Sequence, residues 1–171
     1  WMLGLAAQWL GVNQTQANSV APILISEEQG RHKSTFCRML MPPQLTRYYS
    51  DNLKLTAQGN PERLLAEMGL LNMDEFDKFG AQKMPLLKNL MQMSSLNICK
   101  AYQKNFRPLP RIASFIGTSN RTDLLHDPTG SRRFFCIEAE HDIDCTGIEH
   151  SQIYAQLKEE LLAGARHWFS K

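Results

Sequence analysis

Three short polar segments of this sequence carry the residue types that phosphate and metal chemistry requires. The first runs from Glu27 to Thr35, the second is the acidic pair Asp74-Glu75, and the third ends at Asn120. Each segment follows a short apolar run of strand length. Because ligands of open α/β sheets bind beyond the carboxyl ends of the strands, the three segments predict one shared site.

The first segment matches the phosphate-binding loop pattern GxxxxGK[ST] at Lys33-Ser34, whereas Glu27 and His32 replace the two framing glycines. In such a loop, backbone amides and a helix N-terminus hold the phosphates, the lysine reaches the outer phosphates and the hydroxyl binds Mg²⁺. Histidine is enriched at positive φ, which a framing glycine would adopt. Glu27 brings negative charge toward an anion site unless it points outward. The alternative is a strand–turn–helix with a solvated lysine. The candidate nucleotide ligands are Gln29, Gly30, Arg31, His32, Lys33, Ser34 and Thr35.

The second and third segments supply the groups that a Mg²⁺-dependent ATPase needs for water attack. An aspartate at a strand end orients the metal and a glutamate polarises the water, so Asp74 and Glu75 are candidate catalytic residues. Ser34 and Asp74 are the candidate metal ligands. Asn120 could contact the γ-phosphate or position water. The alternatives are an ordinary strand end for the acids and a cap of the next turn for the asparagine.

Two further candidates, Arg132 and Arg133, enter an apolar strand directly after an Asp-Pro-Thr-Gly turn. A guanidinium suits the charge on a phosphoryl group in transfer, because its planar fork stays protonated and donates two parallel hydrogen bonds. In ring-forming ATPases such an arginine acts on the nucleotide of the neighbouring subunit. The alternative is that both arginines pair with acids at a sheet edge.

The elements that must position these residues alternate between helix and strand. Short apolar runs separated by helical patterns predict an α/β fold with a mainly parallel central sheet covered on both faces. The expected strands are 20–25, 69–73, 112–117 and 134–137. The expected helices are 1–11, 34–40, 61–67, 80–94 and 151–168. We therefore expect a three-layer P-loop NTPase fold.

The bulk composition fits one soluble domain over residues 1–171. The hydrophobic fraction of 43% and net charge of +2 are ordinary, and they permit nucleic-acid binding without indicating it. Four scattered cysteines without a CxxC pair indicate reduced thiols in a cytoplasmic protein. No apolar run approaches the about 18 residues of a membrane span. The apolar start at Trp1 predicts a fragment of a longer polypeptide.

Taken together, the segments resemble the virulence-associated protein E-like family. That family belongs with phage and plasmid primase–helicases and is related to the superfamily-3 helicases of the AAA+ class. The residues that carry the resemblance are Gln29-Gly30-x-x-Lys33-Ser34-Thr35-Phe36, Asp74-Glu75, Gly117-Thr118-Ser119-Asn120 and Leu125-x-Asp127-x-Thr129-Gly130-Ser131-Arg132-Arg133-Phe134. The resemblance implies that Lys33 is the phosphate-binding lysine, Asn120 the sensor, and Arg132 or Arg133 the arginine finger of a ring-forming ATPase.

The resemblance also implies a DNA-gripping hairpin just before the sensor strand. The segment 100–111 lies there and interleaves Lys and Arg with aromatic residues, which suits phosphate contacts and base stacking. The candidate nucleic-acid ligands are Lys100, Lys104 and Arg107, and Arg111 adds to the local basic excess. A solvated basic loop is the alternative. A separate group, His141, Cys145 and His150 with neighbouring aspartates, matches no familiar zinc site.

The function that follows is the ATP- and Mg²⁺-binding core of a primase–helicase-like protein of a phage or mobile element. It would act on DNA and assemble into a homo-oligomeric ring. A rival interpretation is a catalytically inactive P-loop module for DNA binding or protein interaction, which Glu27 and His32 favour. A small-molecule kinase fits less well, because Asp74-Glu75 and the arginines after a turn suit water attack in a ring.

Overall fold

The computed structural model describes residues 1–12, 15–98, 107–124 and 131–169 of the 171-residue chain. Within these ranges five strands form a sheet in the order β2-β3-β6-β1-β7, and each neighbouring pair is parallel. The strands are β1 (Ala21–Ile25), β2 (Tyr49–Ser50), β3 (Leu70–Met73), β6 (Ser114–Ser119) and β7 (Phe134–Glu138). The predicted α/β class with a mainly parallel sheet is therefore confirmed.

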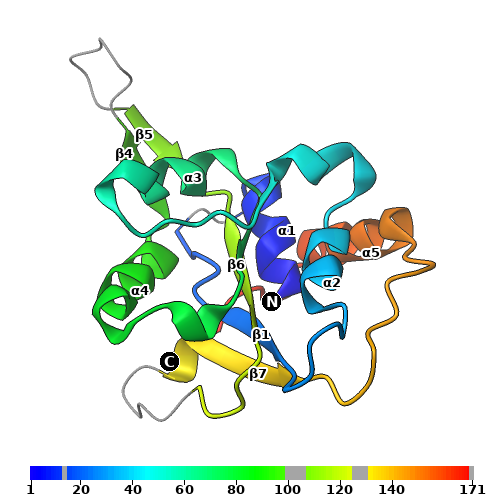
Figure 1. Cartoon of the computed structure of the whole chain (residues 1–171). Coiled ribbons are helices and arrows are strands. Elements are labelled where there is room, and N and C mark those ends of the chain that lie inside the picture. The colour runs from blue at the N-terminus through cyan, green and yellow to red at the C-terminus, as the bar shows by residue number, and fades with distance from the viewer. Residues whose placement is uncertain (13–14, 99–106, 125–130, 170–171) are drawn as a thin grey trace.

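Helices cover both faces of this sheet, as Figure 1 shows. They are α1 (Met2–Leu10), α2 (Lys33–Met39), α3 (Pro61–Glu67), α4 (Met84–Gln92) and α5 (His150–Leu162). On one face, α3 and α4 pack their leucines against inward residues such as Ile23 and Phe115. On the other face, α1 and α2 contribute Leu5 and Cys37 to a second cluster, and α5 packs against α1. Alternate strand residues thus enter opposite layers, as the pleat of a strand requires.

The chain segments that follow the adjacent strands β1 and β6 run toward opposite sides of the sheet. After β1 the chain crosses toward β2 at one edge, and after β6 it crosses to β7 on the other side of β1. This is a topological switch point, where the carboxyl ends of parallel strands open a crevice for ligands. Gly117 of β6 permits the close approach there, since a Cβ would lie 2.7 Å from Ile23 Cδ1.

Most predicted elements occur within two residues of their expected bounds, and the exceptions have local causes. The strand expected at 112–117 is β6, Ser114–Ser119, because the amides of Ile112 and Ala113 bond to Leu65 O instead of a neighbouring strand. The helix expected at 80–94 begins only at Met84. Pro85 lacks an N–H and is accepted in the first turn, and a 3-10 turn, Ala81–Lys83, precedes it.

The C-terminal helix is shorter than expected. The pattern predicts 151–168, whereas α5 ends at Leu162 and is followed by Gly164 at φ +84°. Glycine in this left-handed conformation commonly ends a helix. Further 3-10 turns lie at Pro43–Tyr48, Ala57–Gly59, Phe76–Lys78 and Ser131–Arg133.

A separate antiparallel pair, β4 (Ser95–Ile98) and β5 (Arg107–Pro110), lies between α4 and β6. In Figure 1 this pair projects from the body of the fold beside α3. It occupies the position of the hairpin implied by the family resemblance. The part of the chain that the structure describes contains no helix both long and apolar enough to cross a membrane.

Candidate functional site

A hollow of about 440 Å³ lies where β1, β3 and β6 end. All three segments singled out from the sequence line it, since its walls include Lys33, Asp74 and Asn120. The complete lining is Gln29, Gly30, Arg31, His32, Lys33, Ser34, Thr35, Asp74, Glu75, Thr118, Ser119 and Asn120. The structure thus brings together every predicted nucleotide and metal ligand and three of the five predicted catalytic residues.

The loop between β1 and α2 adopts the backbone that its glycine-like positions require. Gly30 has φ +84° and His32 has φ +59°, so histidine occupies the left-handed conformation expected of a framing glycine. A Cβ at Gly30 would meet no atom within 4 Å, which leaves the loop surface open. Glu27 is exposed and does not line the hollow. The two departures from the loop pattern are therefore accommodated by the fold.

Several backbone amides of this loop have no protein acceptor in the part of the chain that the structure describes. Within the described ranges, the N–H groups of Gln29, Gly30 and His32 donate no hydrogen bond. Backbone donors in folded proteins are almost always paired with protein, water or a ligand. Backbone amides without a protein partner, in a loop that also carries a lysine, are donors that an anion with several oxygens could use.

The Lys33 side chain is buried, with 8% of its surface exposed, and Lys33 lines the hollow. Nζ donates to Ser26 O at 3.2 Å, to Glu28 O at 3.3 Å and to Asn120 Oδ1 at 2.9 Å. Burial lowers the pKa of Lys33; the charge of Asp74 opposes this shift, and that of Arg31 adds to it. Asn120 thus directs its side-chain oxygen to the ammonium, across 87 residues of chain.

The Asp74 carboxylate lies beside the loop and is held by two hydroxyls. Ser34 Oγ donates to Asp74 Oδ1 at 2.7 Å, and Thr118 Oγ1 donates to the same oxygen at 2.6 Å. The register of β3 and β6, with Met73 opposite Gly117, places Asp74 next to Thr118. Sequence reasoning had not selected Thr118, although it lies within the Gly-Thr-Ser-Asn segment of the resemblance.

Glu75 follows in a strained backbone conformation, φ +50°, at the start of the 3-10 turn after β3. Its amide donates to Thr118 Oγ1 at 3.3 Å, and its carboxylate pairs with Lys78 Nζ at 2.6 Å. The hydrogen bond to Glu75 raises the pKa of Lys78. Left-handed backbone at a residue other than glycine is costly and concentrates at functional sites. Thr118 therefore fixes both members of the acidic pair.

We expect Thr118→Val to lower the free energy of unfolding by about 1–2 kcal/mol, because the isosteric methyl leaves the Glu75 amide without its acceptor. Urea denaturation measures this change. Thr118→Ser keeps the hydroxyl and serves as the matched control, with a smaller loss. Equal losses for both variants would show that packing of the methyl group, and not the hydroxyl, stabilises this corner.

The oxygens of Ser34 and Asp74 fit a Mg²⁺ ion. Hydroxyl and carboxylate are ligands of the hard, oxygen-binding type, and Mg²⁺ usually keeps several waters beside one or two such groups. Both lie on the wall of one open hollow, 2.7 Å apart.

The two candidate arginines lie elsewhere in the fold. Arg132 and Arg133 directly precede β7, so they lie near the amino end of that strand, whereas the first hollow lies at the carboxyl ends of the strands. They line a second hollow, of about 550 Å³, with Gln16, Ser19, Val20, Gln92, Trp168 and Phe169. They do not reach the first hollow within one chain, and a role on a neighbouring subunit stays a prediction.

The nucleic-acid candidates Lys100 and Lys104 lie outside the described residues, and so does the side chain of Arg107. Arg111, however, does not belong to a solvated basic surface. It is 3% exposed and donates to five backbone carbonyls, those of Asn18, Leu90, Met91, Met93 and Ala113. The interpretation of Arg111 as part of a basic DNA-facing excess is therefore wrong. It is a structural residue.

The histidine- and cysteine-containing segment after β7 forms no metal centre in the described part of the chain. His150 instead donates from Nε2 to Met39 O at 2.6 Å, at the carboxyl end of α2. Tyr154 donates to Leu40 O at 2.6 Å beside it. These contacts tie α5 to the helix that follows the loop.

The structure defines an α/β protein in which a loop lysine, an acidic pair and an asparagine surround one hollow at the ends of parallel strands. The chain belongs to the virulence-associated protein E-like domain family, whose model matches residues 1–171. The resemblance inferred from the motifs is therefore confirmed. Comparison with curated proteins gives no significant match.

Solved structures with a similar fold include three of the NrS-1 C-terminal region. An apo A-form structure of it has a TM-score of 0.55 at 21% identity, with 98% of this chain and 41% of that chain covered. A second A-form structure and a further apo structure have TM-scores of 0.53 and 0.52, both at 21% identity. They cover 91% and 95% of this chain and 37% and 40% of theirs. This chain thus spans about two fifths of each, and the likeness is one of fold.

Proposed function

We propose that this chain is the ATP- and Mg²⁺-binding core of a primase–helicase-like protein of a phage or mobile element, acting on DNA. The observation that carries the proposal is the convergence of Lys33, Asp74, Glu75 and Asn120 around one hollow. A cation, an acidic pair and an amide from three neighbouring strands are the groups that phosphoryl transfer to water requires.

Each residue has a role that its position supports. The Lys33 ammonium would pair with the outer phosphates, and the loop amides of Gln29, Gly30 and His32 would bind their oxygens. Ser34 and Asp74 would hold Mg²⁺, which supplies charge neutralisation to the phosphates. Glu75 would polarise the attacking water after leaving Lys78, and Asn120 would orient the γ-phosphate. P-loop NTPase is the class that these roles imply.

The DNA-directed part of the proposal rests on the projecting β4–β5 pair and on family membership. Neither Arg132 nor Arg133 reaches the hollow of its own chain. In the proposed ring, one of them would instead act on the nucleotide of the neighbouring subunit. Homo-oligomerisation is thus part of the same proposal.

The rival function is an inactive module that binds DNA or a protein partner. Glu27 and His32 favoured it as departures from the loop pattern. The exposed position of Glu27 and the left-handed backbone of His32 are compatible with a phosphate in this loop and support the ATP-binding proposal over the rival. The three oxygen partners of Lys33 within its own chain remain the observation that favours the rival.

A thermal-shift titration separates the two functions. ATP with Mg²⁺ at 100 times its Kd should raise the free energy of unfolding by about 2.7 kcal/mol. For a domain of this size the melting temperature should rise by roughly 5–10 °C. Lys33→Ala should abolish the rise, whereas the exposed Lys158→Ala should keep it. Absence of any rise in the unmodified protein at millimolar ATP would favour the inactive module.

A further inference from the structure

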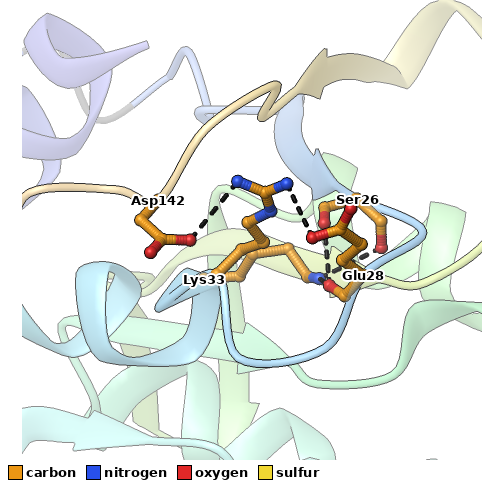
Figure 2. A network of polar contacts seen from close by, with 5 residues as sticks. Ser26, Glu28, Lys33 and Asp142 are labelled. Atoms are coloured by element: carbon orange, nitrogen blue, oxygen red, sulfur yellow. Dashed lines mark hydrogen bonds and ion pairs between the residues drawn. The ribbon is translucent and has the colours of Figure 1, made fainter.

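Arg31 lies on the wall of the hollow between two carboxylates that belong to different parts of the chain. One guanidinium nitrogen pairs with Glu28 Oε2 at 2.7 Å, and the other pairs with Asp142 Oδ1 at 3.4 Å. Figure 2 shows Glu28 and Asp142 approaching from opposite sides. The Arg31 side chain is 19% exposed, whereas both carboxylates are 73% exposed. The guanidinium is thus enclosed while its partners remain close to water.

The guanidinium also keeps a donor without a partner. Nε of Arg31 is buried and has no acceptor among the described residues. A buried donor without a partner is rare, and one at a hollow indicates water or a ligand. The positive charge of Arg31 also reaches Lys33, whose pKa it helps to lower. Two cations that repel each other on one wall would both be stabilised by a single polyanion between them.

The segment that carries Asp142 is attached to the loop and to α2 at several points. Ala139 N donates to Ile25 O at 2.8 Å, and Ile143 N donates to Arg31 O at 3.3 Å. Further along, His150 and Tyr154 hold the last carbonyls of α2. Among these contacts, the Arg31–Asp142 pair is the one between two side chains, and it joins positions 111 residues apart. It can break while the backbone contacts persist.

We propose that Arg31 is a phosphate-binding residue restrained by Asp142, and that nucleotide binding exchanges this ion pair for one between Arg31 and the phosphates. The inference rests on the proposed function and adds to it a limit on nucleotide affinity. We call this limit the brake: the Arg31–Asp142 ion pair competes with the binding of phosphate by Arg31. A guanidinium binds phosphate through parallel hydrogen bonds that are stronger than a long pair with an exposed carboxylate. Asp142 is the partner that yields, since its contact is longer than that of Glu28.

A double-mutant cycle with ATP and Mg²⁺ tests the exchange, with Kd measured by titration calorimetry. Asp142→Asn should tighten binding by about two- to fivefold, the worth of an exposed ion pair. Arg31→Gln should weaken binding by at least about tenfold. In the Arg31→Gln background, Asp142→Asn should have no effect, because the brake acts through Arg31. An equal gain in both backgrounds would overturn the inference.

Two controls sharpen the outcome. Glu140→Gln removes the same charge from an exposed residue of the same segment, and it should leave Kd unchanged. A gain matching that of Asp142→Asn would mean that general charge removal is responsible, which overturns the brake. Inorganic triphosphate should reproduce the cycle, since the contact is with phosphate; loss of the coupling with this probe would overturn the assignment of the contact.

Failure of the proposed function has a different signature. If the unmodified protein binds neither ATP nor triphosphate, both the function and the brake fall. If it binds ATP, and Lys33→Ala abolishes this binding while Arg31 and Asp142 show no coupling, the brake alone falls.

Discussion

Lys33→Ala is expected to abolish ATP binding, and Glu75→Gln is expected to abolish turnover while binding persists. Lys33 is a buried cation that lines the hollow, so its removal takes away the charge proposed to pair with the phosphates. Glutamine at position 75 has nearly the shape of glutamate but cannot accept a proton from water. A positioned general base contributes about 10²–10⁴ in rate, and we expect a loss in that range.

Binding is measured by calorimetry and turnover by phosphate release from an assembled oligomer. An assembled sample is used because the proposed role of Arg132 or Arg133 is on a neighbouring subunit; neither lines the first hollow of its own chain. Unchanged turnover in both variants would refute the ATPase. Lost binding in Glu75→Gln would instead assign Glu75 to nucleotide or metal binding. Circular dichroism controls for folding, since Lys33 and its three oxygen partners also contribute to the structure of the loop.

The strand ends were predictable from the sequence because buried parallel strands read as unbroken apolar runs. Ala21–Ile25 is such a run, and Leu70–Met73 is apolar apart from the buried Asn72; each is followed at once by polar residues. Parallel strands end at a common edge, so linear order alone brings the loop lysine toward Asp74 and Asn120. The roles of these residues in ATP hydrolysis stay predictions.

Contacts that depend on the pairing register of two strands, or on a segment that folds back from a distant part of the chain, were not predictable from the sequence. Thr118 lies beside Asp74 only because Met73 pairs with Gly117, and nothing in either strand's own sequence fixes that offset. Asp142 reaches Arg31 because the chain after β7 folds back over the loop. In sequence it is one acid among several in an ordinary polar stretch. Such long-range pairs have no local signature.

The burial of the Arg111 side chain was likewise not predictable from the sequence. It follows basic residues and Pro110, and so reads as the end of a solvated segment. Its side chain instead turns inward, lying over the Phe115 ring at 5.1 Å. Burial lowers its pKa to about 9, so the guanidinium remains charged at neutral pH. Only the tertiary fold, which presents five carbonyls to it, makes this position favourable.

Arg111→Met is therefore expected to lower the free energy of unfolding by at least about 3 kcal/mol. Its acceptors include Met91 O at 2.6 Å, Ala113 O at 2.7 Å and Asn18 O at 2.9 Å. A buried ion pair can be replaced by apolar residues with little loss when both partners are removed. Here the partners are backbone carbonyls, several at the carboxyl end of α4, which no substitution removes. Ala113 O would keep the hydrogen bond from Gln8 Nε2, but the other carbonyls would lose the buried donor that Arg111 supplies.

Urea denaturation monitored by circular dichroism measures the change, and Arg121→Met provides the matched control. Arg121 carries the same group, but its side chain is 60% exposed and pairs with Asp123, so its loss should cost far less stability than the loss of Arg111. Arg111→Lys should be intermediate, because an ammonium keeps the charge but cannot span carbonyls from three segments. If Arg111→Met were no more destabilising than Arg121→Met, the five hydrogen bonds would not be what joins the end of β5 to α4 and β6.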